Sequence, residues 1–131
     1  MTPSNTMLAE AATILKGRGR WAKGSYRTWR STEMTDASAC YCAMGALSVA
    51  ATDGAWHVPT AEVVTTRGFK TARAKLAKAV IELYGPVKDI EAEKTTMVPP
   101  SSPEAIITNF NDAKKTTKGM VLKAFARAQE L

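Results

Sequence analysis

The amino-acid sequence predicts a mainly α-helical protein, a compact single-domain bundle over residues 1–131 with about four to six helices. Apolar residues recur at steps of three and four in several segments, which is the period of an amphipathic helix. Glycines and prolines separate these segments. A chain of 131 residues with 45% apolar content also has the size and composition for one hydrophobic core.

The first helix is expected from about Thr6, where apolar residues begin to recur at helical spacing. Ser4, Asn5 or Thr6 can serve as its N-cap, and Gly17 is a natural stop. The next segment, residues 17–30, is basic and rich in glycine. It is expected to form a loop with one short extended stretch.

A second helix is expected over Ala39–Thr52, a segment rich in alanine that is followed by Asp53 and Gly54. Residues 55–68 are expected to form a loop with a helical turn. The sequence also allows a small strand pair around residues 26–30 and 63–65, where aromatic and β-branched residues are frequent.

A third helix is expected over Phe69–Tyr84, because its apolar residues fall at steps of three and four. Gly85 and Pro86 end it. Its other face is basic and carries Lys70, Arg73, Lys75 and Lys78. Residues 87–102 contain prolines and alternating charges, and are expected to form an exposed loop.

Two further helices are expected near the end of the chain. Ser101 or Ser102 can cap a short helix that starts at Pro103 and runs to about Phe110. After a break at Asn111 and Asp112, Thr116 or Thr117 can cap the last helix. The expected buried stripe of that helix consists of Met120, Val121, Ala124, Phe125 and Ala128.

Three motifs resemble those of an uncharacterised family, a domain of unknown function found in actinobacteria and their phages. They are the opening helix LAEAATILKGRGRW, the Cys-x-x-Gly-Ala-Leu segment at 42–47, and Phe110-Asn111-Asp112, where the family prefers Trp-Asn-Asp. The resemblance implies a shared mainly helical domain and no activity. The phenylalanine, the basic N-terminal third and a proline-containing insertion at 98–103 fit a phage-encoded variant.

Composition places the chain among basic proteins of the cytoplasm. The net charge is +6 and the sequence pI is about 9.5, which favours an acidic partner. No apolar stretch approaches the roughly 20 residues of a membrane span, and no basic segment precedes the first apolar stretch. Cys40 and Cys42 are too close in sequence for an unstrained disulfide, so reduced thiols in a cytoplasm are expected, the host cytoplasm for a phage protein.

The sequence contains no complete catalytic or metal-binding set, so neither an enzyme nor a cofactor is predicted. Cys40, Cys42 and His57 are the only cysteines and histidine, fewer than the four ligands of a structural zinc site. Cys42 lies in an apolar segment, where a thiol behaves as a small hydrophobe. His57 has Asp53 and Glu62 as candidate partners without a spacing that requires them. The acids Glu91 and Glu93 are expected to be solvated.

Cys42, Asn111 and Asp112 are predicted to form a polar junction beneath the core. The functional interpretation is a contact site for a small molecule or peptide, with Asp112 as an acid or acceptor. The structural interpretation is that Asn111 or Asp112 caps backbone donors and ties two helices together. The structural interpretation is preferred, because Asn and Asp serve so often as caps.

The basic aromatic segment from Arg18 to Arg30 is the predicted partner-binding surface, together with the basic face of the 70–78 helix. Tryptophan, tyrosine and arginine dominate protein interfaces, which predicts a non-enzymatic module that binds a host or viral protein. Nucleic acid is the alternative partner, because rings can stack on bases and cations can bind phosphates. A third interpretation makes the tryptophans core anchors. The predicted partner-binding residues are Arg18, Arg20, Trp21, Tyr26, Arg27, Trp29, Arg30, Lys70 and Arg73.

Overall fold

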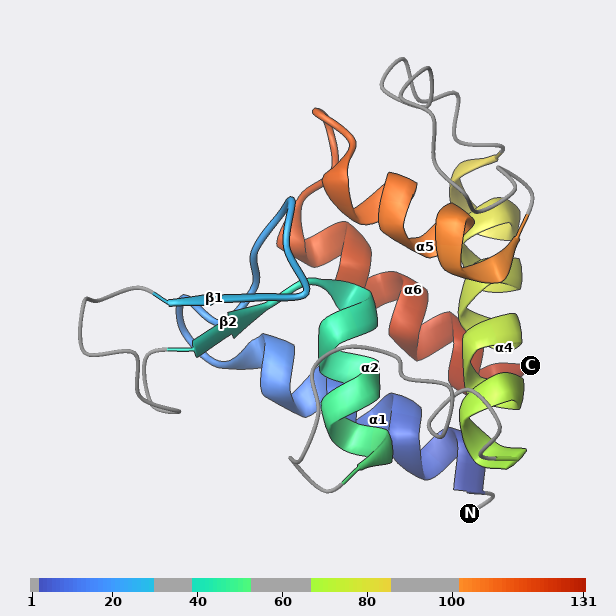
Figure 1. Cartoon of the computed structure of the whole chain (residues 1–131). Coiled ribbons are helices and arrows are strands. Elements are labelled where there is room, and N and C mark those ends of the chain that lie inside the picture. Colours follow the sequence, from blue (N-terminus) through green and yellow to red (C-terminus); the bar gives the residue numbers. More distant parts are fainter. Residues whose placement is uncertain (1–2, 30–38, 53–66, 86–101) are drawn as a thin grey trace.

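The computed structural model describes residues 3–29, 39–52, 67–85 and 102–131. Within these ranges the chain forms five α-helices and one two-stranded antiparallel sheet. The prediction of a mainly α-helical fold with a small strand pair is therefore confirmed (Figure 1). The expected helical turn in 55–68 and the expected loop at 87–102 lie almost entirely outside the described residues. The strand expected at 63–65 lies wholly outside them, and the partner seen for the 26–30 strand is Ala39–Tyr41.

Helix α1 spans Pro3–Lys16 and begins earlier than predicted. A proline is favourable in the first turn, where the backbone N–H has no helical partner. Ser4, Asn5 and Thr6 consequently lie inside the first turn and are not the N-cap. The apolar face of α1 is fully buried at Leu8 and Leu15, and the helix ends where the Gly17 amide donates to the Ile14 carbonyl.

The sheet pairs β1 (Arg27–Trp29) with β2 (Ala39–Tyr41). The prediction that Ala39 begins a helix was wrong, because residues 39–41 have hydrogen-bond partners on both sides. On one side they pair with β1. On the other side Tyr41 donates to the Arg20 carbonyl at 2.7 Å and accepts from the Ala22 amide at 2.9 Å.

Helix α2 spans Ala43–Ala51, and Cys42 is its N-cap. The Cys42 Sγ accepts from the Gly45 amide at 3.3 Å. Every residue from Ala43 to Ser48 is buried, so α2 is enclosed by the rest of the fold. A helix that is apolar on all sides is expected in such a central position.

Three longer segments complete the bundle. Helix α4 (Arg67–Tyr84) ends at Gly85, whose φ of 76° favours glycine. Helix α5 (Pro103–Asp112) is capped by Ser102 and continues two residues beyond the expected end at Phe110. Helix α6 (Lys118–Glu130) is capped by Thr117 rather than Thr116. The predicted stripe of α6 is buried except at Met120, which is partly exposed.

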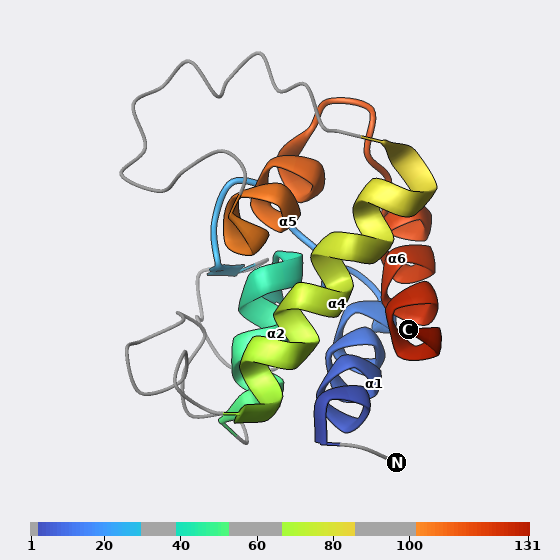
Figure 2. The ribbon, with the colours of Figure 1, turned by 90° about the vertical axis from the view of Figure 1, so that its right-hand side faces the viewer.

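Helix α4 packs against two pairs of helices, with α1 and α6 on one side of it and α2 and α5 on the other (Figure 2). The core between them contains large, fully buried side chains from every helix, among them Phe69 and Phe125. Burial of each such side chain contributes about 1.5–3 kcal/mol. The β1–β2 sheet lies on the side of the molecule away from α4 (Figure 1).

Candidate partner-binding site

Asn111 is the centre of the polar junction beneath the core. Its side chain lies in the last turn of α5 and is fully buried. The Oδ1 atom accepts from the Trp21 Nε1–H at 2.7 Å and from the Ala43 amide at 3.0 Å. The Nδ2 group donates to the Ala22 carbonyl at 3.0 Å and to Asp112 Oδ1 at 2.9 Å. Both donors and both acceptor positions of the amide are thereby used.

Asp112 connects this junction to the loop before β1, and Cys42 lies beside it at the start of α2. Asp112 Oδ1 also accepts from the Gly24 amide at 2.9 Å, which fixes the loop before β1. Cys42 is the N-cap of α2, and the amide of the next residue, Ala43, donates to Asn111 Oδ1. The structure thus brings the three predicted residues together, with their polar atoms bonded to backbone and to one another. This arrangement favours the structural interpretation over a contact site for a small molecule.

Cys42 has the electrostatic environment of an inert thiol. Burial raises the pKa of the Cys42 thiol to about 11, and the neighbouring Asp112 carboxylate acts in the same direction. The thiol therefore keeps its proton at neutral pH, whereas thiol nucleophiles react as thiolates. Cys40 is also a free cysteine, and its Sγ lies 2.9 Å from the Gly19 carbonyl.

The aromatic residues of the 17–29 segment are anchored to the fold. Trp21 is tied to Asn111, and the Tyr26 hydroxyl donates to Glu104 Oε1 at 2.7 Å. Burial and the Glu104 carboxylate raise the pKa of Tyr26. Trp29 packs against the core, with the Arg27 guanidinium 4.7 Å from its ring centroid. All three rings are partly buried, as the core-anchor interpretation requires.

Two lysines connect residues 16–24 to the turn between α5 and α6 and to the start of α6. Lys23 Nζ donates to the Ala113 carbonyl at 2.7 Å. Lys118 Nζ donates to the Gly17 carbonyl at 2.8 Å and to the Lys16 carbonyl at 3.3 Å. These bonds place residues 16–24 beside residues 113–118, and both segments are rich in basic residues. We call this surface the basic end, and it consists of Lys16, Arg18, Arg20, Lys23, Lys114, Lys115 and Lys118.

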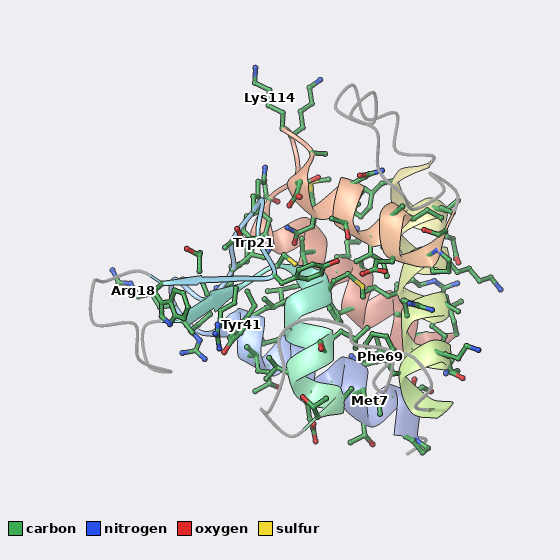
Figure 3. The ribbon with its side chains drawn as sticks, in the orientation of Figure 1. Met7, Arg18, Trp21, Tyr41, Phe69 and Lys114 are labelled. Carbon is green, nitrogen blue, oxygen red and sulfur yellow. The ribbon has the colours of Figure 1, made fainter. Side chains whose placement is uncertain are left out.

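Two acidic side chains of the described residues contact the 17–26 segment through hydrogen bonds. Asp112 bonds to Asn111 and to the Gly24 amide, and Glu104 accepts from Tyr26. In Figure 3, Lys114 projects from the top of the molecule and Arg18 lies at its left edge, with Trp21 between them. Lys114 and Lys115 of the basic end are exposed to solvent, and Trp21 is held by Asn111.

The two basic surfaces that the sequence predicts as partner-binding lie apart in the fold. Lys70 and Arg73 lie on α4, on the side opposite the sheet and the 17–29 segment (Figures 1 and 2). Arg30 lies outside the described residues. The lysines that lie near the 17–24 loop are Lys114, Lys115 and Lys118, in the segment beside it, and not Lys70 and Arg73. The run KKTTK at 114–118 is the sequence signal that could have identified them.

The other candidate residues carry no site in the described part of the chain. Asp53, His57, Glu62, Glu91 and Glu93 lie outside it. Within residues 3–29, 39–52, 67–85 and 102–131, no three His, Cys, Asp or Glu side chains are arranged to hold a metal ion. None of the helices in these ranges is both long and apolar enough to cross a membrane.

Comparison with known proteins identifies the family of this chain. Residues 1–131 match a family of unknown function (DUF6197), and the chain belongs to that family. Comparisons with curated proteins and with solved structures gave no match.

Proposed function

We propose that this member of a family of unknown function is a non-enzymatic interaction module that binds an acidic protein surface through its basic end. The observation that carries the proposal is that two segments with seven cations, 16–23 and 114–118, lie side by side in the fold. Lys23 and Lys118 hold these segments together through backbone carbonyls. Such a patch attracts a negatively charged partner and accelerates its association.

The distribution of charge along the chain supports an acidic partner. The described residues contain 15 of the 18 Lys and Arg but only five of the 12 Asp and Glu. The helical core with its sheet is therefore considerably more basic than the net charge of +6 indicates. A surface of one sign repels a partner of the same sign, so the charge also restricts the range of partners.

The aromatic residues favour a protein over single-stranded nucleic acid. Base stacking needs an open ring face, whereas Trp21 and Tyr26 are partly buried and hydrogen-bonded through their polar atoms. A half-buried aromatic residue beside arginine and lysine is typical of protein interfaces. The proposal includes a phage-type accessory role in the host cytoplasm. This part is based on the resemblance of the three sequence motifs alone.

The test compares a variant of the basic end with a variant of matched charge elsewhere. Lys114→Glu with Lys115→Glu reverses two exposed charges at the basic end, and Lys70→Glu with Lys78→Glu does the same on α4. We expect the wild type and the α4 variant to capture the same acidic protein from nuclease-treated host lysate. The basic-end variant should lose it, and titration of the purified partner should show the same order of affinities.

Nucleic acid is the competing partner, and it has a distinct signature. Binding to phosphates releases counterions, so affinity for DNA or RNA would fall steeply between about 50 and 200 mM salt. If the basic end binds nucleic acid in this way and captures no protein after nuclease treatment, the protein-binding proposal is wrong. Equal capture by the wild type and the basic-end variant would also refute it.

A further inference from the structure

A second basic feature lies on α4, away from the basic end. The outward face of α4 forms a shallow hollow of about 380 Å³ that is largely open to solvent. Residues from α4 line most of it, and the end of α6 closes one side. The lining consists of Lys70, Thr71, Ala74, Lys75, Lys78 and Leu131.

Helix geometry explains why a hollow forms here. Residues 70, 74 and 78 follow one another at steps of four and lie in one row on the helix surface. Ala74 is the middle member of this row, and its methyl group leaves open space between Lys70 and Lys78. Both lysines are exposed, so their ammonium groups can turn toward a ligand in that space.

Lys75 supplies a fixed donor at the edge of the same hollow. Its Nζ donates to Ser4 Oγ at 3.3 Å and to Asn5 Oδ1 at 3.2 Å, both in the first turn of α1. Asn5 is itself held by a bond from Nδ2 to the Gln129 carbonyl at 3.1 Å. An ammonium group has three N–H donors, so Lys75 retains one for a ligand.

Lys70, Lys75 and Lys78 form no ion pair with another described residue. The ion pairs in this part of the chain join Arg127 to Glu82 and to Glu130. Lys75 and Lys78 are three positions apart, a spacing at which like charges destabilise a helix slightly. A multiply charged anion would relieve this repulsion.

We infer that this hollow binds a small molecule that carries two linked phosphate groups. The lysines supply charge-assisted hydrogen bonds to phosphate oxygens. The lining contains no aromatic ring on which a nucleobase could stack. The phosphates are therefore the recognised part, and free pyrophosphate and a nucleoside diphosphate should bind with similar affinity. The site is independent of the proposed function, because it shares no residue with the basic end.

The experiment is a titration of the full chain with inorganic pyrophosphate, followed by amide NMR in a metal-free buffer at constant ionic strength. We expect saturable binding at one site, with the largest shifts near Lys75. Lys70→Met with Lys78→Met should weaken binding by about ten-fold or more, because hydrogen bonds between charged groups are among the strongest. A parallel titration with ADP tests whether the nucleoside contributes.

Two further variants distinguish a shaped site from general attraction to positive charge. Ala74→Leu places a larger side chain in the middle of the hollow and leaves every charge in place, and leucine is well tolerated on an exposed helix face. It should abolish binding. Lys114→Gln with Lys115→Gln removes two charges from the basic end and should leave binding unchanged. Wild-type affinity in Ala74→Leu, equal loss in both charge variants, or no saturable binding would each overturn the inference.

Discussion

At the scale of single residues, Asn111 shows why an amide is required at the polar junction. The side chain meets two N–H donors, from Trp21 and Ala43, and two acceptors, the Ala22 carbonyl and Asp112 Oδ1. An aspartate could accept both hydrogen bonds but could not donate in return, and its charge would be buried beside Asp112. Asparagine satisfies all four partners without a charge.

Replacement of Asn111 by alanine is expected to lower the free energy of unfolding by about 3 kcal/mol. The change leaves the Trp21 indole N–H and the Ala43 amide without acceptors, and each unsatisfied buried donor costs about 1–3 kcal/mol. Urea denaturation measures the loss. Asn109→Ala, two residues earlier on the same helix at a partly exposed position, is the control and should change stability by less than about 0.5 kcal/mol. Equal losses in both variants would contradict the role of Asn111.

Cys42 is expected to make stability depend on pH in the alkaline range. Burial raises the pKa of its thiol from 9.0 to about 11, so the folded protein holds a proton that the unfolded chain releases. The stabilising contribution is complete below pH 9 and is lost as the pH rises toward 11. Tyr26 acts in the same direction, since its pKa is also raised.

The measurement is urea denaturation of the wild type and of Cys42→Ser between about pH 8 and 10.5. Serine keeps an N-cap oxygen but does not titrate in this range. The free energy of unfolding of the wild type should fall by about 1–2 kcal/mol more than that of the variant. The loss of one proton lowers this free energy by at most about 1.4 kcal/mol for each pH unit. Because Tyr26 is present in both proteins, its contribution cancels. Parallel pH profiles would show that the thiol is not the source.

At the scale of secondary-structure elements, Gly45 sets how closely α2 approaches the strand that follows Tyr26. A Cβ atom built at Gly45 would lie 1.9 Å from the Tyr26 carbonyl oxygen and 2.8 Å from its carbonyl carbon. Both are backbone atoms, which cannot rotate away. The glycine is therefore required by a close approach, and α2 would have to separate from the 17–29 segment to accommodate any side chain.

Gly45→Ala is expected to destabilise the fold by about 3 kcal/mol or more, the upper end of the cost of overpacking a core. Gly119→Ala is the matched control. Its Cβ would meet only Thr117 Oγ1, at 3.8 Å, and alanine near the start of α6 should raise stability by about 0.5–1 kcal/mol. Thermal and urea unfolding of both variants test the contrast, and a stabilised Gly45→Ala would disprove the close packing.

Elements with strong local signals were predictable, and elements that depend on distant partners were not. The period of apolar residues and the cap at Ser102 indicated α4 and α5 to within two residues at each end. Ala39–Tyr41 was assigned to a helix, because its alanine and cysteine contain no local sign of strand pairing. Its partners are Arg27–Trp29 and the carbonyl and amide of residues 20 and 22, which the fold alone brings to it.

The same distinction applies to the candidate site. Asn111 and Asp112 were identifiable as a polar pair that follows an apolar run, and Cys42 as a residue of the apolar segment expected to face them. The junction of Lys23 and Lys118 with backbone carbonyls was not identifiable, because no local pattern encodes contact between residues about 100 positions apart. The separation of α4 from the 17–29 segment likewise depends on the order of helices in the bundle.

At the scale of the whole molecule, charge is unevenly distributed along the chain. Fifteen basic and five acidic residues lie in the described part. Repulsion among like charges destabilises a compact state, and salt screens it. The same charge that favours an acidic partner thus lowers the stability of the free protein.

We therefore expect the midpoint of thermal unfolding to rise when NaCl increases from about 20 to 200 mM, since the Debye length falls from about 20 Å to about 7 Å. Lys114→Gln with Lys115→Gln, which removes two exposed charges of the basic end, should show a smaller rise. Differential scanning calorimetry provides the measurement. A midpoint that falls with salt would show that attractive pairs such as Arg127 with Glu82 outweigh the repulsion.

The four hydrogen bonds of Asn111 also impose an order on folding during synthesis. Trp21, Ala22 and Ala43 precede Asn111 by 90, 89 and 68 positions. A ribosome adds about 5–20 residues each second, so α1, the sheet and α2 emerge several seconds before α5. Until then the Trp21 indole and the first amide of α2 have no acceptor from Asn111. Trp21, Ala22 and Ala43 can therefore form their hydrogen bonds to Asn111 only after the last quarter of the chain has been synthesised.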